Sequence, residues 1–337
     1  MKNKRNFIVL VIALILVFYF TTKDDFVGII NQLSNINIKI FLLAIIIFLT
    51  ALFFKSISLY IYLRQYKKNY PLKKAYYLTL IGQFLNGITP FQSGGQPFQI
   101  YLLKKEGIKI SDSTNAMIKD FLSFQIALVT MGIVAIILNS NMNILNDVFS
   151  LKTFVLFGFL INFVVLLFLI IILCSKKSLI KLVNKFIDFI FKFRIMSKIG
   201  LNKEDLTHGV NNFYRNGKEL RKSKVKLLIT VLINLINLFL LYTIPFVIFK
   251  SFDVSGISIL DSIIVITFVT LIGNFIPIPG ATGGIEYSFL RLFGSFTIKS
   301  TILSSVMLVW RFITYIFGMF VGLITLIITK GVDKKCE

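Results

Sequence analysis

Seven ionisable side chains lie within the strongly apolar stretches of this chain, and they are the residues best placed to do chemistry there. They are Lys55, Lys119, Asp120, Asp261, Glu286, Arg291 and Arg311. Burying an ionisable group in a membrane is costly, so such a group usually faces a cavity, a partner or a polar headgroup. Arg311 is the strongest single candidate, because a guanidinium offers a fork of donors that suits a phosphate.

Arg311 and Lys119 occupy similar positions relative to two glycine pairs. Lys119 follows Gly95 by 24 residues, and Arg311 follows Gly284 by 27. We predict that the two bases hold a lipid phosphodiester between two related halves of the chain. The alternatives are that Arg311 pairs with Glu286 and that Lys119 extends to the cytoplasmic interface, as long basic side chains do.

The acidic and amide residues near these bases complete the predicted lipid site. Glu286 stands in the first turn of a helix, where a carboxylate is stabilised by about 0.3 to 1 kcal/mol. It either caps that helix or recognises a cationic headgroup such as an aminoacyl ammonium. Asp120 either belongs to the lipid site or neutralises a neighbouring base. The uncharged members of the predicted headgroup path are Asn86, Gln92, Gln96, Gln99, Asn274 and Thr282.

These residues surround a short irregular segment that occurs twice. Both copies read I-G-x-F followed by P-x-x-x-G-G, from Ile81 to Gly95 and from Ile272 to Gly284. Proline and paired glycines break helices, and a broken backbone survives at bilayer depth only where protein or a watery cavity satisfies its polar groups. We therefore predict hairpin tips of a transport-type site, rather than two ordinary loops. The predicted tip residues are Pro90, Gly94 and Gly95 in the first copy and Pro279, Gly283 and Gly284 in the second.

The composition indicates a membrane protein. Hydrophobic residues make up 56% of the 337 residues, and the mean hydropathy is +0.83. We predict an all-α polytopic integral membrane protein with six full transmembrane helices and two re-entrant helical hairpins in an inverted repeat. The predicted spans are residues 7–22, 39–63, 114–138, 153–175, 227–249 and 300–329, and the broken segments are 75–103 and 259–295.

This division predicts five regions along the chain. Residues 1–38 hold an N-terminal signal-anchor helix and an outer interfacial segment, and residues 39–138 form the first helix, hairpin, helix repeat. Residues 139–226 hold a connecting transmembrane helix and a basic amphipathic segment. Residues 227–329 form the second repeat, and residues 330–337 are a cytoplasmic tail.

The basic residues predict the orientation of the chain. Of the 37 Lys and Arg residues, 28 fall on the side of the termini and five on the opposite side. Both termini are therefore expected in the cytoplasm. The basic stretch at 176–226 is predicted to lie on anionic lipids of the inner leaflet, with plain positive-inside topology as the alternative.

The predicted hairpins are too short to span a bilayer. Residues 75–88 and 262–275 are segments of 14 residues each, or about 21 Å of helix against a hydrocarbon layer of about 30 Å. The first hairpin opens toward the cytoplasm. The second opens outward, because an odd number of full spans separates the two.

Several other functions lack the residues they need. His208 is the only histidine, so no Ser/His/Asp or Cys/His catalytic set forms at the membrane. Neither glycine pair has the spacing of a nucleotide-binding loop. No metal site and no cofactor are expected, and the net charge of +22 is accompanied by no nucleic-acid-binding motif.

The two hairpin stretches resemble a known family. Gly87 to Leu102 and Ile278 to Glu286 are similar to signature stretches of the transmembrane flippase domain of bacterial lysylphosphatidylglycerol synthases, the multiple peptide resistance factor family. The resemblance covers roughly residues 5–330. It implies the flippase-like half without the soluble synthase domain, in the bacterial cell membrane. Related sequences often carry Glu and Arg where this chain has Gln96 and Gln99.

The expected function is therefore a phospholipid flippase that moves an anionic or aminoacylated lipid such as lysyl-phosphatidylglycerol between leaflets. Two alternatives stay open: phosphatidylglycerol lysyltransferase, as the enzyme or its membrane subunit, and a non-catalytic cell-envelope scaffold. The expected partners are a membrane phospholipid and either a second copy or a separate lipid synthase.

Overall fold

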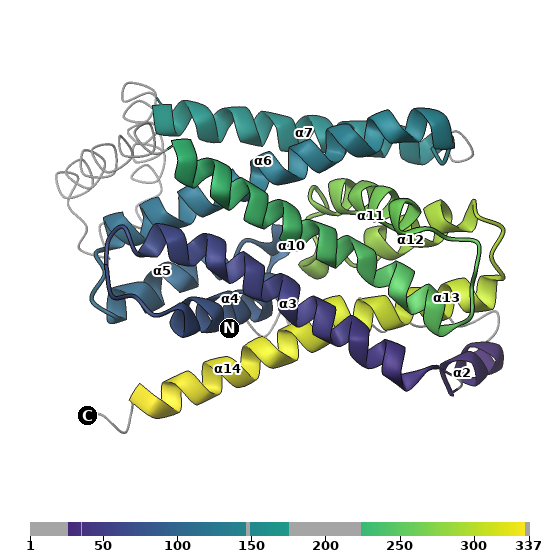
Figure 1. Cartoon of the computed structure of the whole chain (residues 1–337), viewed down its shortest axis with the longest axis horizontal. Coiled ribbons are helices and arrows are strands. Elements are labelled where there is room, and N and C mark those ends of the chain that lie inside the picture. The colour runs from purple at the N-terminus through teal and green to yellow at the C-terminus, as the bar shows by residue number, and fades with distance from the viewer. Residues whose placement is uncertain (1–25, 35, 146–148, 175–223, 334–337) are drawn as a thin grey trace, which may run out of the picture.

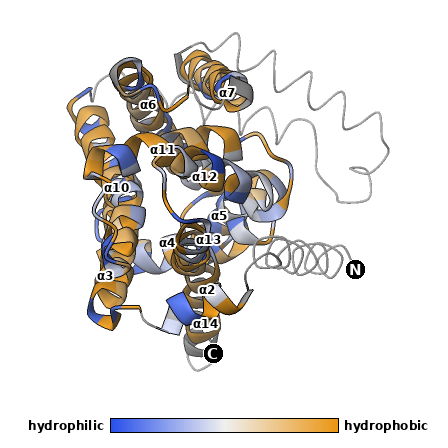
Figure 2. Cartoon of the chain, turned by 90° about the vertical axis from the view of Figure 1, so that its right-hand side faces the viewer, coloured by the Kyte–Doolittle hydropathy of each residue, from blue (hydrophilic) through white to orange (hydrophobic). Residues whose placement is uncertain are grey.

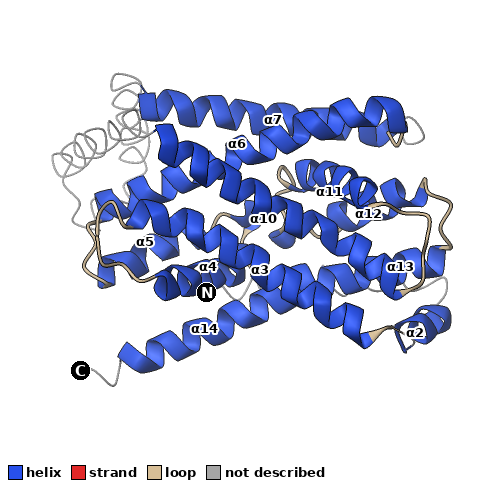
Figure 3. Cartoon of the chain, in the orientation of Figure 1, coloured by secondary structure: helices blue, strands red, loops and turns tan. Residues whose placement is uncertain are grey.

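The computed structural model describes residues 26–34, 36–145, 149–174 and 224–333. Within these ranges all regular structure is helical (Figure 3). The α-helices are α2 Phe26–Ser34, α3 Ile38–Leu63, α4 Leu72–Gly87, α5 Gly95–Lys105, α6 Ile110–Met142, α7 Phe149–Cys174, α10 Lys224–Ser251, α11 Ile259–Gly273, α12 Gly284–Gly294, α13 Ser300–Arg311 and α14 Gly318–Asp333. Short 3-10 turns η1 Pro90–Gln92 and η3 Pro279–Ala281 form the two tips, and a π-helical turn, η4 Phe312–Phe317, joins α13 to α14.

Five helical segments in the described ranges are long and apolar enough to cross a membrane. They are Ile38–Leu63, Ile110–Ser140, Leu151–Ile171, Lys224–Ser251 and Ser300–Thr329. These segments coincide with five of the six predicted spans, and the sixth, at 7–22, lies outside the described residues. The protein is thus an all-α, multi-pass membrane protein.

The outer surfaces of the long helices are apolar, as the bilayer requires. In α7 the large side chains Phe154, Phe157, Leu160 and Val164 are all exposed. Hydrophobic residues also cover much of α3 and α10 (Figure 2). Water would disfavour so large a continuous apolar surface, whereas lipid tails accommodate it.

The helices α3 and α10 pack side by side in opposite directions. Tyr62 near the end of α3 bonds to Thr230 near the start of α10 at 2.8 Å, and Asn234 bonds to Ser58 at 2.9 Å. Figure 1 shows the same inversion for the elements that follow: α4 and α5 lie toward one end of the long helices, and α11 and α12 toward the other. The two helix, hairpin, helix units are therefore antiparallel.

Each hairpin is shorter than a membrane span. The outgoing arms α4 and α11 have 16 and 15 residues, and the returning arms α5 and α12 have 11 each. At 1.5 Å per residue, the longest arm reaches about 24 Å. Within each hairpin the two arms pack against one another.

The hairpin tips turn through unusual backbone conformations. At the first tip Phe91 and Gln92 have φ of 54° and 53°, and at the second Gly280 and Ala281 have 64° and 52°. Non-glycine residues rarely adopt positive φ. Such strain persists only where the surroundings impose it, and it concentrates at functional sites.

A close approach between the two arms explains the glycine pair of the first tip. The Asn86 side chain accepts the Gly95 N–H at 2.8 Å, and the Thr89 hydroxyl accepts the Gly94 N–H at 2.9 Å. A Cβ at Gly95 would stand 2.5 Å from Asn86 Oδ1. The start of α5 thus receives its N-terminal cap from α4 across the turn.

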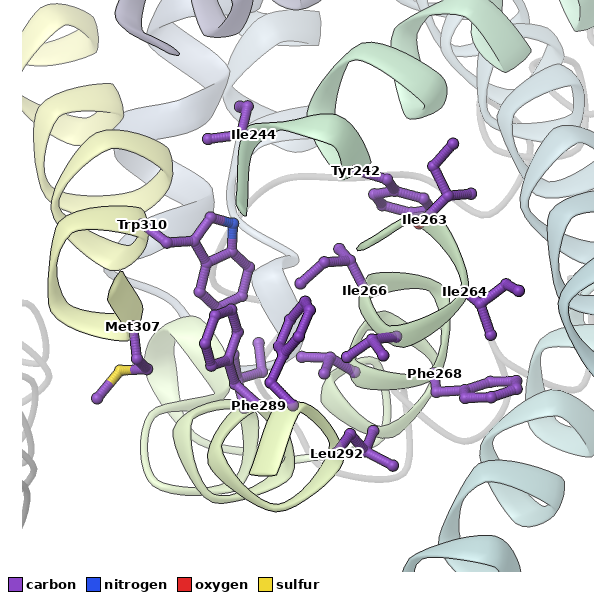
Figure 4. Close-up of a cluster of buried hydrophobic side chains, with 14 of the residues drawn as sticks. Tyr242, Ile244, Ile263, Ile264, Ile266, Phe268, Phe289, Leu292, Met307 and Trp310 are labelled. Carbon is purple, nitrogen blue, oxygen red and sulfur yellow. The ribbon is translucent and has the colours of Figure 1, made fainter. Parts of the chain in front are cut away.

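An aromatic and aliphatic core holds the second hairpin in place (Figure 4). Phe289 of α12 stacks on Trp310 of α13 with ring centroids 4.8 Å apart, and it also contacts Phe293 at 4.6 Å. Both phenylalanines are fully buried. Aromatic pairs of this kind contribute about 0.5 to 1.5 kcal/mol beyond their buried area, so they fix α12 against α13.

Candidate functional site

The tips of the two hairpins meet in the middle of the molecule. The turns η1 and η3 contact each other, although they lie far apart in sequence. Tyr315 links the two halves, because its hydroxyl donates to the Gly87 carbonyl at 2.9 Å. The same ring lies against Gly280, where an added Cβ would come within 2.3 Å of it. Tyr315 therefore contacts both hairpins where their tips meet.

A cavity of about 490 Å³ lies at this junction. Side chains from both hairpins and from α3, α6, α7, α10 and α13 line it. Its polar and charged lining residues are Lys55, Thr79, Gln83, Asn86, Gln92, Gln96, Gln99, Asp120, Gln125, Asn162, Asn237, Tyr242, Thr270, Asn274, Arg311, Thr314 and Tyr315. The volume falls in the range of small-molecule sites in proteins.

Arg311 is held on three sides at the cavity wall. Its Nε lies 2.6 Å from Glu286 Oε1, an ion pair in which the N–H is not aligned for a hydrogen bond. Its Nη2 donates to the Gly280 carbonyl at 3.1 Å, and the guanidinium lies over the Tyr315 ring at 4.4 Å. These contacts fix the guanidinium beside the second tip.

Glu286 has two roles that the sequence left as alternatives to ligand binding. It pairs with Arg311, and its Oε2 accepts the Gly283 N–H at 2.6 Å, so it caps the start of α12. The carboxylate is buried behind Arg311 and does not line the cavity. Its charge is satisfied by one cation and one helix terminus.

A second ion pair lies on the wall that the first repeat contributes. Lys55 Nζ contacts Asp120 Oδ2 at 2.8 Å, and the Ser58 hydroxyl donates to Asp120 Oδ1 at 2.6 Å. Lys55 also donates to the Asn234 side chain at 3.3 Å and lies over the Phe124 ring at 4.8 Å. The lysine side chain is 23% exposed and the aspartate 9%, so the cation is the more accessible partner.

Tyr315 lies within the π-helical turn η4. The turn follows Arg311 directly and widens the helix for one turn. Such turns are rare and occur frequently at functional sites. Arg311 and Tyr315, four residues apart at this turn, contact each other and both hairpins.

Amide side chains form a second polar surface of the cavity. Gln125 of α6 donates to the Asn162 side chain of α7 at 2.9 Å, and Asn274 donates to the same oxygen at 3.1 Å. Gln99 donates to the Leu78 carbonyl at 2.8 Å. Asn237 of α10 is buried among the lining residues, and its side-chain oxygen has no hydrogen-bond partner within the described residues.

The structure separates the predicted site residues into two groups. Those that line the cavity are Arg311, Asp120, Asn86, Gln92, Gln96, Gln99 and Asn274. Those that do not are Lys119, Glu286, Thr282 and the tip residues Pro90, Gly94, Gly95, Pro279, Gly283 and Gly284. The tip residues build the turns that bound the cavity, and Thr282 bonds to the Pro279 carbonyl at 2.9 Å.

Lys119 is directed away from Arg311. It is 1% exposed, and its amino group donates to Gln65 at 3.1 Å and to the Tyr66 hydroxyl at 3.0 Å. These partners follow the C-terminal end of α3. The structure does not bring Lys119 and Arg311 together at one phosphate position, and Lys55 is the basic residue of the first repeat that reaches the cavity.

Several polar cavity residues are absent from the predicted set, among them Lys55, Tyr315, Gln125, Asn162 and Asn237. Lys55 was recognisable as an embedded charge. Gln125, Asn162 and Asn237 were recognisable as amides inside apolar spans, where polar groups require partners. Tyr315 carries no comparable signal, because one tyrosine among many aromatic residues is ordinary.

The cavity is lined by two cations, Lys55 and Arg311, by one anion, Asp120, and by several amides, and apolar helices bound it. Among the described residues, no group of three or more His, Cys, Asp or Glu side chains is positioned to hold a metal ion. The groups at the cavity suit charge recognition and hydrogen bonding of a polar headgroup.

Comparisons with known proteins agree that this chain is a membrane protein. A family model described as the lysylphosphatidylglycerol synthase transmembrane region matches residues 6–322. The matched range contains both hairpins and every cavity-lining residue. A UPF0104 membrane protein of Methanocaldococcus jannaschii is 23% identical to this chain over an alignment of 355 residues. The alignment covers 99% of this chain and 98% of that protein.

Proposed function

The chain belongs to the family of the lysylphosphatidylglycerol synthase transmembrane region, and from that premise we propose that it is a phospholipid flippase. The lipid that it moves between the leaflets is anionic or aminoacylated, of the lysyl-phosphatidylglycerol type. Its headgroup enters the cavity at the junction of the hairpin tips, and its acyl chains stay among the apolar helix surfaces.

One observation carries this proposal: a cavity lined by the charged residues Lys55, Asp120 and Arg311 lies where two broken helices from opposite ends touch. Charged groups at such depth are costly and usually mark a path for polar or charged substrates. Broken helices in inverted repeats are typical of transporters whose substrate site lies near the bilayer midplane.

The inverted arrangement supports movement between leaflets. If each hairpin is re-entrant, one opens to each side of the membrane, and the cavity lies between their tips. A small shift of one hairpin relative to the other then exposes the cavity to one leaflet at a time. The contact from Tyr315 to Gly87 joins the two halves in the conformation described here.

We further propose that the loops joining α3 to α4 and α5 to α6 face the cytoplasm of a bacterial cell. These loops and adjoining helix ends carry Arg64, Lys67, Lys68, Lys73, Lys74, Lys104, Lys105 and Lys109, whereas the opposite end carries Lys39, Lys152, Lys250 and Lys299. An excess of basic residues is typical of cytoplasmic loops. The predicted membrane-surface segment at 176–226 would add to that side, although almost all of it lies outside the described residues.

Reconstitution of the purified protein tests the flippase proposal. Vesicles carry phosphatidylglycerol with a fluorescent acyl chain, and dithionite quenches only the outer leaflet, so the second quenching phase reports headgroup movement. Arg311→Ala is expected to slow that phase roughly tenfold or more, since a hydrogen bond to a charged group contributes about 1.5 to 3 kcal/mol.

Arg291→Ala is the matched control, because Arg291 is exposed, lies over Tyr287 at 5.6 Å and does not line the cavity. Its vesicles are expected to quench at the wild-type rate. Elution of each variant as a single species in gel filtration verifies its folding. Absence of lipid movement by the wild-type protein would refute the proposed function, and equal rates for Arg311→Ala and wild type would remove Arg311 from it.

A further inference from the structure

The three carboxylates embedded in the apolar segments differ in what holds them. Glu286 accepts the Gly283 N–H, and Asp261 accepts the Ser258 N–H at 2.7 Å, so both cap helix N-termini. Backbone donors and the helix dipole stabilise the charged form of such carboxylates. Asp120 lies in the interior of α6 and accepts from two side chains, Lys55 and Ser58.

Asp120 is also the one of these three carboxylates that lines the cavity. Its partner Lys55 is the most exposed member of the two ion pairs, at 23% against 9% for Arg311. A lysine on a flexible stem changes partner more easily than a guanidinium with three contacts. The pair of Lys55 and Asp120 is therefore the exchangeable one.

Within the described part of the chain, the neighbours of Asp120 supply no second cation in contact with it. From α3 it faces Lys55, Ser58 and the nearby Tyr62, whose hydroxyl bonds to Ser123 at 2.7 Å, and α10 places the Asn234 amide beside Lys55. The other helices packed on α6 carry their charges near their ends: Lys104 and Lys105 on α5, Lys152 on α7, Lys224, Lys226 and Lys250 on α10, and Asp261 on α11. Lys119, the adjacent residue, donates to Gln65 and Tyr66.

Charge balance then limits what the cavity accepts. The two ion pairs sum to zero, so an anionic headgroup that enters adds one uncompensated negative charge in a medium of low dielectric constant. An isolated ion in such a medium is strongly disfavoured. A proton that enters with the headgroup removes this cost.

We infer that Asp120 takes up one proton when an anionic phospholipid headgroup binds, and that Lys55 then passes from Asp120 to the lipid phosphate. The proton adds to a carboxylate oxygen of Asp120, and no other bond forms or breaks. The net charge at the cavity stays zero in both states. This inference rests on the proposed function, and it makes the handling of an anionic lipid dependent on protons.

The test measures proton uptake and lipid binding in the same titration. Purified protein in unbuffered detergent solution is titrated with short-chain phosphatidylglycerol, below the lipid's own micelle concentration, while a pH indicator records proton uptake and calorimetry records binding. Wild type is expected to take up close to one proton per bound lipid, and its Kd to rise by up to tenfold per pH unit wherever binding takes up that proton. Short-chain phosphatidylcholine, which is zwitterionic, brings no net charge and is expected to bind without proton uptake.

Asp120→Asn is expected to bind phosphatidylglycerol with no proton uptake and with a Kd independent of pH. Asp112→Asn, the same substitution in the first turn of α6 and away from the cavity, should retain the uptake of one proton. Two results overturn this inference and leave the flippase proposal standing. One is that wild type binds phosphatidylglycerol without proton uptake, and the other is that proton uptake persists in Asp120→Asn. If wild type binds neither lipid, the inference and the flippase proposal both fail. The number of protons that wild type takes up per bound lipid still tests the inference if Asp120→Asn does not fold.

Discussion

The ion pair between Arg311 and Glu286 is the feature of the cavity whose energetic role can be measured most directly. Arg311→Met removes the guanidinium and leaves the Glu286 carboxylate buried, with the Gly283 N–H as its remaining contact. Removing one partner of a buried pair costs about 3 to 5 kcal/mol. Polar contacts within membranes are often weaker, since the unfolded chain also finds partners there. We therefore expect Arg311→Met to lower the free energy of unfolding by about 3 kcal/mol.

The double variant Arg311→Met with Glu286→Gln should be more stable than Arg311→Met alone. Glutamine brings no charge, and its oxygen can still accept the Gly283 N–H that caps α12. We expect the second substitution to recover about 1 to 2 kcal/mol, because a neutral amide is far cheaper to bury unpaired than a carboxylate. A double-mutant cycle compares this recovery with the effect of Glu286→Gln in the wild-type protein, and the difference is the coupling energy of the pair.

Unfolding of the four proteins in mixed micelles of increasing denaturing-detergent content, followed by the fluorescence of Trp310, supplies the free energies. Trp310 is the only tryptophan of the chain, and it precedes Arg311 in α13. If the two single variants add in the double variant to within about 0.5 kcal/mol, the two side chains are energetically independent. That result would refute the reasoning from their 2.6 Å contact.

Two further substitutions test how the hairpin tips are held. Tyr315→Phe keeps the ring over Arg311 but removes the hydrogen bond to the Gly87 carbonyl. The free energy of unfolding, measured in the same assay, should therefore fall by about 1 to 3 kcal/mol. An unfolding free energy equal to that of wild type would show that this bond is dispensable. Gly280→Ala should be more damaging than Gly107→Ala. Both glycines have positive φ, which costs an alanine about 1 kcal/mol, but a Cβ at Gly280 also meets the Tyr315 ring at 2.3 Å, while that at Gly107 meets nothing within 4 Å. Equal losses of thermal stability in the two alanine variants would contradict the packing described for the second tip.

Much of the architecture was predictable because membranes impose simple rules on sequence. Five apolar stretches of sufficient length became five spans, and Pro90 and Pro279 marked the two breaks. The inverted order followed from counting spans between the hairpins. The boundaries differ by a few residues, as in α4, which begins at Leu72 rather than Ala75, because the lysines at its start prolong the helix beyond its apolar part.

The candidate site was predictable in part. Arg311 and the amides of the first hairpin line the cavity, as their positions near the breaks suggested. The proximity of Glu286 to Arg311 was one of two alternatives that the sequence could not rank. Tyr315 was not predictable, because its role depends on a π-helical turn and on the meeting of two tips far apart in the chain.

The sequence by itself determined the membrane setting, the number of described spans, the two breaks and the set of embedded charges, because each depends on local composition and on the thickness of a bilayer. Only the tertiary structure decided which charges pair. Adjacent residues on a helix point about 100° apart, so Asp120 faces Lys55 of another helix while its neighbour Lys119 turns to Gln65 and Tyr66. The packing of α3, α6 and α10 makes that choice, and with it the charge balance of the cavity.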